Sequence, residues 1–347
     1  MRDYKDRYRG EKSWTAMYYP KRSKAHGVKK IHKGFHRSKQ RFSMTTTTSS
    51  HPASTQIAWG PVIWIGGLHL ASLLAFVPGT FSWSALAVCL FLHWFTGGIG
   101  ICMTYHRLLT HRSFATRPKF LEYMLTALGA CASEGGAVGW VADHRRHHAH
   151  SDEEDDTHSP NRGFGWAHMF WWMTPDITSI HTFEYYERWA PDLNADPVHR
   201  WLDRYHFLFP SLMGVALYAI GGLPWLVWGC FVRSILVLHT TWLVNSATHI
   251  WGYRSHATRD NSTNLWWVAL LTYGEGWHNN HHAFATSARH GLRWWEIDMT
   301  YWAIRLMALC GLAYAIKLPR SLNPGRAKVA RISDRRNDET ELVGAVN

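Results

Sequence analysis

The chain has 347 residues, of which 46% are hydrophobic, and it contains 21 tryptophans and 14 tyrosines. This length is enough for one large domain or two small ones, and the aromatic-rich composition is typical of a lipid-facing protein. The five cysteines are widely spaced and form no Cys-x-x-Cys pair, which argues against a disulfide framework or a thiolate metal site.

The formal net charge of +12 comes almost entirely from the N-terminal arm. Residues 1–43 contain 14 Lys/Arg and 3 Asp/Glu, and a Thr/Ser run follows at residues 45–50. Basic arms bind nucleic acid or anionic lipid headgroups, but this arm has neither helical periodicity nor the apolar core of a signal peptide. We therefore interpret residues 1–55 as a disordered extension and linker, and expect no nucleic-acid partner.

Four apolar runs are predicted to cross the membrane as two helical hairpins. Residues 57–77 and 83–105 are each long enough for a hydrocarbon core of about 30 Å, and a Pro-Gly turn joins them. Residues 207–220 and 225–248 form the second pair, joined by Gly-Gly-Leu-Pro. The third run is short for a span, and the fourth contains Arg233, so the boundaries of this pair are the less certain ones.

Charge outside the apolar runs predicts their orientation. Neither turn contains Lys or Arg, whereas the N-terminal arm, residues 106–206 and the chain after His249 are rich in both. The positive-inside rule places these three regions in the cytoplasm. We therefore predict an all-α integral membrane protein with four transmembrane helices in two hairpins and a cytoplasmic helical cap, formed by residues 56–318 and followed by a polar tail, 319–347. A bacterial inner membrane and an endoplasmic reticulum fit equally well.

Histidines dominate the predicted cytoplasmic segments. On a helix, positions i, i+3 and i+4 project from one face, so each H-x-x-H-H element is predicted to aim three imidazoles at a common point. Imidazole binds iron, zinc, copper and nickel. The repeated spacing therefore predicts a metal site built from distant segments. Among 24 histidines, the three boxes are His106-x-x-x-x-His111, His144-Arg-Arg-His147-His148 and His278-Asn-Asn-His281-His282.

An i, i+4 pair, Asn245 and His249, lies where the fourth predicted span leaves the membrane. Polar packing between helices is an alternative for this pair, although polar groups at membrane depth are also functional candidates. Beside the histidine boxes, we favour a role in metal binding.

Other polar residues near the boxes are assigned simpler roles. Asp143 and Glu275 are candidates to orient imidazoles by hydrogen bonding, with surface or helix-end roles as the alternative. The acidic run 152–156 is interpreted as a solvated loop, and His150 and His158 as surface residues.

The boxes and their flanking residues resemble one known family. Over about residues 55–318 the chain resembles the membrane fatty-acyl desaturases of the Δ9, stearoyl-CoA desaturase-like family, and its Trp-Val-Ala-Asp-His-Arg string looks more like the bacterial and plant branch. The strings that carry the resemblance are Thr104-Tyr-His-Arg-Leu-Leu-Thr-His-Arg-Ser-Phe114, His144-Arg-Arg-His-His148, Asn245-Ser-Ala-Thr-His249 and Gly274-Glu-Gly-Trp-His-Asn-Asn-His-His282.

The resemblance implies a di-iron site with O2 as co-substrate. Asn245 would act through a bound water, and Trp242 would lie beside the acyl chain, with an interfacial anchor as the alternative for this tryptophan. The implied ligands of the two iron ions (Fe2+) are His106, His111, His144, His147, His148, His249, His278, His281 and His282.

The chemistry of desaturation explains the implied cofactor and partners. Removing two hydrogens from unactivated methylenes is beyond any protein side chain. The chain has no dinucleotide fingerprint and no haem-binding His-Pro-Gly-Gly string, so the resemblance implies an external donor: ferredoxin or cytochrome b5, with a reductase. A carboxylate-bridged di-iron bundle needs two Glu-x-x-His elements, and only Glu275-x-x-His278 is present.

The predicted function is O2-dependent insertion of a cis double bond, at Δ9, into a saturated acyl chain carried on CoA or lipid. Animal acyl-CoA members have an Arg where this chain has Ala142, and an Arg-Lys pair where it has residues 173–175, so these phosphate-binding charges are missing. Two alternatives remain: a di-iron lipid hydroxylase or ketolase, and a histidine-rich membrane metal transporter, which would place its ligands within a spanning pathway.

Overall fold

The computed structural model describes residues 57–174 and 181–319. These residues belong to one compact unit. The predicted extension at 1–55 and the predicted tail beyond Pro319 lie outside the described residues, and the predicted domain limits stay a prediction.

Three helical stretches are long and apolar enough to cross a membrane: Trp59–Phe76, Trp83–Thr110 and Leu208–His249. The first combines α2 (Trp59–Ser72) with the short 3-10 helix η2 (Leu73–Phe76). The second combines α3 (Trp83–Leu92) with the π-helix η3 (His93–Thr110). The second stretch therefore continues past the predicted end at residue 105 and carries His106 within it.

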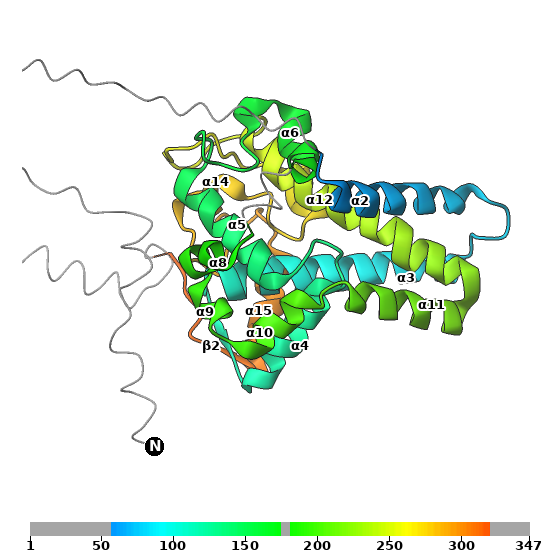
Figure 1. Ribbon diagram of the computed structural model, residues 1–347. Coiled ribbons are helices and arrows are strands. Elements are labelled where there is room, and N and C mark those ends of the chain that lie inside the picture. Colours follow the sequence, from blue (N-terminus) through cyan, green and yellow to red (C-terminus); the bar gives the residue numbers. More distant parts are fainter. Residues whose placement is uncertain (1–56, 175–180, 320–347) are drawn as a thin grey trace, which may run out of the picture. The chain divides into compact units, whose positions relative to one another are not determined.

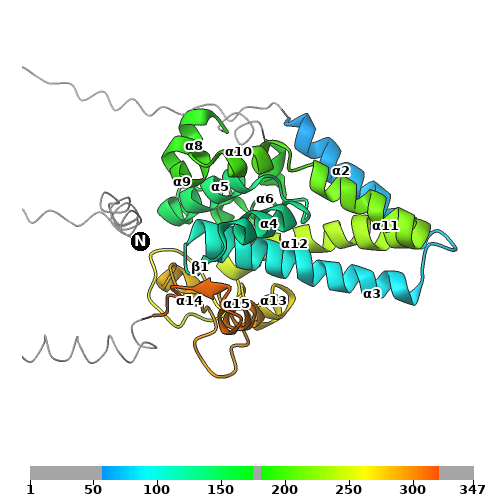
Figure 2. The same cartoon turned by 90° about the horizontal axis from the view of Figure 1, so that it is seen from below.

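The third stretch is interrupted at the predicted Gly-Gly-Leu-Pro turn. Gly222 has φ 63° and ψ −158°, a conformation that glycine adopts without a steric penalty, and Pro224 cannot donate a helical hydrogen bond. A Cβ on Gly214 would lie 3.4 Å from Cys230 Sγ, so the segments before and after the break pack together. Figures 1 and 2 show the chain reversing its direction after α11 and returning toward α12. The elements of this stretch are α11 (Leu208–Leu226), η6 (Val227–Val232), α12 (Arg233–Ser246) and η7 (Ala247–His249).

The remaining helices gather at one end of α2, α3, α11 and α12 (Figure 1). One two-stranded antiparallel pair, β1 (Ala115–Thr116) with β2 (Ala313–Tyr314), departs from the all-α prediction, and the rest of the regular structure described is helical. These helices are α4 (Lys119–Ala130), α5 (Ala137–His150), η4 (Pro160–Arg162), α6 (Phe164–His168), η5 (Phe170–Met173), α8 (Phe183–Trp189), α9 (Pro191–Asn194), α10 (Pro197–Arg204), α13 (Trp266–Leu271), α14 (His278–Ala283) and α15 (Met299–Leu309).

A buried apolar cluster holds η3, α5 and α15 together. Ile101 and Leu108 of η3 pack in it with Val141 of α5 and Ile304 of α15. Glycine allows a further close approach, because a Cβ on Gly100 would lie 2.9 Å from the α-carbon of the α4 residue Gly129. This packing fixes the first histidine box, at the end of η3, against the second box on α5.

Candidate metal centre

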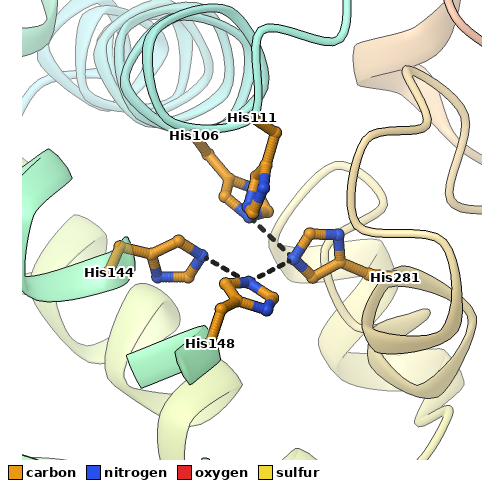
Figure 3. Close-up of side chains that lie close together, drawn as sticks. All are labelled: His106, His111, His144, His148 and His281. Atoms are coloured by element: carbon orange, nitrogen blue, oxygen red, sulfur yellow. Dashed lines mark hydrogen bonds between the residues drawn. The ribbon is translucent and has the colours of Figure 1, made fainter. Parts of the chain in front are cut away.

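Five histidines from three distant segments form a first cluster (Figure 3). His106 lies on η3, and His111 is the first residue after the end of η3. His144 and His148 lie on α5, and His281 lies on α14. The Nε2 atom of His281 is 3.1 Å from His106 Nε2 and 2.9 Å from His148 Nε2. The His148 and His144 Nε2 atoms are 3.1 Å apart.

Four further histidines form a second cluster: His147, His249, His278 and His282. The Nε2 atom of His278 lies 3.0 Å from the Nε2 atoms of both His249 and His282. The ring of His147 lies 5.3 Å from that of His282, between centroids. All four side chains are buried. All nine histidines implied as ligands are thus divided between two clusters.

Each H-x-x-H-H element divides its histidines between the two clusters. Its i, i+4 pair enters one cluster, and the i+3 histidine, His147 or His281, enters the other. The prediction that each triplet aims at a common point is therefore wrong. Successive helical residues are about 100° apart, so position i+4 lies about 40° to one side of i around the axis and i+3 about 60° to the other side. Each helix lies beside both clusters and contributes to both.

The geometry of both clusters fits a bound metal ion. A neutral imidazole nitrogen can take part in one hydrogen bond, either as donor or as acceptor. His281 Nε2 faces both His106 Nε2 and His148 Nε2, so hydrogen bonding alone cannot satisfy this arrangement. Metal–nitrogen bonds of about 2.1 Å would place neighbouring ligands about 3 Å apart. Burial also lowers the pKa values of five of these side chains well below 6.5, which keeps them neutral and able to bind a metal. These are His111, His144, His148, His278 and His281.

Carboxylates face the outer nitrogen, Nδ1, of four cluster histidines. Such partners fix the tautomer of a ligating histidine and orient its ring. Burial disfavours the Glu275 carboxylate, but Arg107, His290 and His106 outweigh it and lower the Glu275 pKa well below its ordinary value. The four pairs are His106–Glu275 at 2.8 Å, His147–Asp156 at 3.0 Å, His249–Asp152 at 3.1 Å and His282–Asp260 at 2.8 Å.

Several sequence interpretations of polar residues need correction. Asp156 is only 1% exposed and His158 is 4% exposed, so the acidic run is more than a solvated loop and His158 is not a surface residue. Asp143 accepts hydrogen bonds from His181 and Tyr185, and among the described residues it accepts none from a box histidine. Sequence spacing alone gave no signal for these partners.

One buried residue beside the first cluster was also missed. His290 has its ring 4.4 Å from that of His281, and its Nδ1 lies 3.0 Å from Glu275 Oε2. It lies outside any box, eight residues after His282, so no spacing pointed to it.

A cavity of about 270 Å³ reaches both clusters. It is lined by His106 and His144 of the first cluster, His278 of the second, and Trp242 and Asn245. Trp242, the predicted neighbour of the substrate, is buried at 1% exposure. Asn245, the predicted water-mediated ligand, therefore faces the same space as His278. The lining surface is predominantly apolar, as an acyl chain requires.

A buried carboxyl group also lines this cavity. Glu134 accepts hydrogen bonds from Trp140 Nε1 at 3.0 Å and Thr241 Oγ1 at 2.7 Å. Burial raises the pKa of Glu134 to about 7. This residue ties α5 to α12 across the cavity, and the sequence gave no indication of it.

Comparison with known proteins decides between the functions that such a site allows. The fatty acid desaturase family model matches residues 81–315. The chain belongs to the fatty acid desaturase family. It is 48% identical over 277 residues to an sn-1 stearoyl-lipid 9-desaturase of Anabaena variabilis, covering 79% of this chain and 98% of the relative. It is 46% identical over 262 residues to an acyl-CoA C20 Δ5-desaturase of Anemone leveillei, covering 76% and 82%.

A third relative is named for an acyl chain carried on a galactolipid. The desaturase is 45% identical over 261 residues to a chloroplastic palmitoyl-monogalactosyldiacylglycerol Δ7 desaturase of Arabidopsis thaliana, covering 75% of this chain and 69% of the relative. The family and these names confirm a fatty-acyl desaturase, an oxidoreductase, over the hydroxylase and transporter alternatives.

Removing the carboxylate partner of His282 is expected to weaken metal binding by the desaturase. Asp260→Asn keeps the side-chain volume but removes the charge that faces His282 Nδ1 at 2.8 Å. Partners of this kind typically contribute 10–100-fold to metal affinity or activity, so we expect a loss of about that size. Iron titration of the purified variant measures it. Asp155→Asn is the matched control because Asp155 is exposed, and equal affinities in the two variants would contradict the assigned role.

Acid is expected to destabilise the metal-free desaturase. Histidines in the unfolded chain take up protons near pH 6.5, whereas burial keeps most histidines of the folded site neutral to lower pH. The unfolded state therefore binds more protons than the folded state as the pH falls, and the free energy of unfolding falls with the pH. The raised pKa values of His147 and His181 oppose this trend. The histidines with lowered pKa values outnumber them: His158 and His282, each lowered to about 4, and His144, His148, His278 and His281, each lowered well below 6.5.

The measurement is the Tm of the metal-free protein in detergent at pH 7.5 and at pH 5. We expect a lower Tm at pH 5, with the change falling between the ordinary histidine pKa of 6.5 and about 4. A Tm that stays constant or rises over this interval would show that the buried histidines do not titrate as argued.

Proposed function

We propose that the desaturase inserts a cis double bond at Δ9 of a saturated acyl chain that is esterified to a membrane glycerolipid. The observation that carries the proposal is the apolar cavity that passes from Trp242 and Asn245 to histidines of both clusters. Relatives named for 9-desaturation of lipid-bound stearoyl and palmitoyl chains support this regiochemistry and carrier.

Charge at the cavity favours a lipid carrier over CoA. Among the described residues, neither this cavity nor the adjoining one is lined by Lys or Arg. CoA carries several phosphates, which proteins bind with such side chains. A glycerolipid ester has no phosphate next to its acyl chain and needs no such charge inside the cavity.

The proposed metal site holds two irons. The first would be bound by the five-histidine cluster, and the second by the four-histidine cluster with a water on Asn245. The iron pair would supply the activation of O2, which accepts two electrons from ferredoxin or cytochrome b5, two protons and two substrate hydrogens to give two waters. Glu275, Asp156, Asp152 and Asp260 would hold the imidazoles in the ligating tautomer.

The protein would also position the acyl chain and exclude water from its reacting carbons. Trp242 and Trp140 would hold the acyl chain against the two clusters, so that adjacent methylenes lie at a fixed depth. Because these side chains form an apolar wall, water is excluded from the reacting carbons. The depth of the cavity between ester and metal would therefore select the position of the double bond.

We further propose four membrane crossings. The break at Gly222 divides the third apolar stretch into two arms that pack together, which supports a second hairpin. The absence of Lys and Arg from both turns supports a cytoplasmic cap, in a bacterial inner membrane or an endoplasmic reticulum.

Reconstitution tests the carrier. The iron-loaded protein is placed in phosphatidylcholine vesicles with reduced ferredoxin, or with cytochrome b5 and its reductase, and offered stearoyl chains either in the lipid or as stearoyl-CoA. We expect monounsaturated phosphatidylcholine, formed only with O2 and the donor. Conversion of stearoyl-CoA alone would overturn the lipid carrier, and hydroxylated chains would overturn desaturation.

A further inference from the structure

A second cavity, of about 290 Å³, adjoins the metal-site cavity. Pro61, Gly135, Trp172 and His206 line both, so the two spaces meet at these residues. The second cavity reaches no histidine of either cluster. The metal chemistry therefore does not account for it.

The second cavity lies between the first turns of two helices that can span the membrane. Gly60, Pro61 and Trp64 belong to α2, while Phe207 and Pro210 lie at the start of α11. The start of α2 is fixed to the cap, because the Ala58 amide donates to the Met173 carbonyl at 2.9 Å.

The walls of this cavity are suited to a lipid. Trp64 is 41% exposed and Phe207 is 49% exposed, so aromatic side chains stand at its outer edge. Aromatic residues at this level of a membrane helix are typical of the lipid–water interface. Ile65 and Leu238 line its inner part. An opening here would face the acyl chains and ester groups of the bilayer.

An indole N–H group that has no hydrogen-bond partner within the described part of the chain lies at the junction of the two cavities. Trp172 lines both, and its indole Nε1 is buried without a hydrogen-bond acceptor among the described residues. A buried donor without an acceptor is costly. The carbonyl oxygen of an acyl ester, seated at this junction, would accept that hydrogen bond.

We infer that the second cavity is a lateral portal, through which an acyl chain of a bilayer glycerolipid passes between α2 and α11 into the metal-site cavity. The inference rests on the proposed lipid substrate. The glycerol backbone would stay at the membrane interface beside Trp64 and Phe207, and the chain would pass Trp172 to reach the histidines. The substrate would never leave the membrane.

Two glycines of α2 provide a matched pair of variants. A Cβ on Gly60 or on Gly67 would meet no atom within 4 Å, so both positions accept a side chain without a clash. Gly60 lines the portal, whereas Gly67 does not. Gly60→Phe would fill the portal, and Gly67→Phe adds the same ring elsewhere on the same helix. Equal iron contents in the two variants would show that the metal centre is unchanged.

The first readout is photocrosslinking and does not depend on activity. The full-length, iron-loaded protein is reconstituted with a phosphatidylcholine that carries a diazirine near the carboxyl end of its sn-1 stearoyl chain. We expect labels at Trp172 and at residues 206–210 in the wild type and in Gly67→Phe, reduced about tenfold in Gly60→Phe because the added ring occupies the space. Labelling confined to outward-facing residues such as Leu70, or unchanged in Gly60→Phe, would overturn the portal.

The second readout is desaturation of the same vesicles, with stearoyl-CoA supplied in parallel. Selective loss of phosphatidylcholine desaturation in Gly60→Phe supports the portal. Conversion of stearoyl-CoA alone, equal in both variants, would overturn the portal while leaving the desaturase activity intact. Labelling inside the cavity without any desaturation would support the portal and contradict the proposed substrate.

Discussion

Replacing His281 with alanine is expected to lower desaturation by more than about 100-fold, since even the outer partners of metal ligands typically contribute 10–100-fold. The Nε2 atom of His281 faces both His106 and His148 within 3.1 Å, so its loss opens the centre of the first cluster. The second cluster contains no atom of His281 and would keep its ligands. We therefore expect iron content to fall from two ions per chain toward one.

Elemental analysis of the purified variant measures iron, and product formation measures activity. His150→Ala is the control, because His150 lies on the same helix as the second box but belongs to neither cluster. If His281→Ala retained both irons and wild-type activity, the first cluster would not be a ligand set.

The largest loss of stability is expected from Arg107→Met. Arg107 is fully buried, and its guanidinium lies 2.9 Å from carboxylate oxygens of both Glu275 and Asp298. It also donates to the Ala288 carbonyl at 2.8 Å. Removing the cation would leave two carboxylates buried without their counter-charge, and breaking a buried ion pair in this way typically costs about 3–5 kcal/mol.

A thermal unfolding scan in detergent compares this variant with Arg305→Met, whose arginine is exposed. We expect a much lower Tm for Arg107→Met and little change for the control. Because Glu275 also faces His106, iron affinity should fall as well. Equal Tm values for the two variants would show that the buried carboxylates find other partners.

Local spacing predicted the elements of the site well. The two H-x-x-H-H elements lie on helices, His106 lies at the end of an apolar helix, and His249 ends another, as the periodicity and the apolar runs indicate. These features depend on short-range geometry, which sequence spacing encodes directly. The break at Gly222 likewise falls within the predicted turn, where glycine and proline both oppose a continuous helix.

Long-range packing was not predictable in the same way. Whether His147 joins His144 or crosses to His278 depends on where α5 lies relative to α14, and no local pattern fixes that placement. Asp260 is 22 residues before His282, and Asp152 is 97 residues before His249, so their pairing arises only from the fold. The neighbours of Asp152 in sequence are acidic, which made a solvated loop the simpler interpretation of that run.

The two histidine clusters are expected to carry the desaturation of acyl chains. Expression of the wild type or of His278→Ala in a desaturase-deficient host tests this, with the fatty-acid profile and double-bond positions determined by mass spectrometry. We expect new cis-Δ9 monounsaturated chains on glycerolipids in the wild type alone. An unchanged profile, despite membrane expression and a supplied electron donor, or equal products from both proteins, would contradict it.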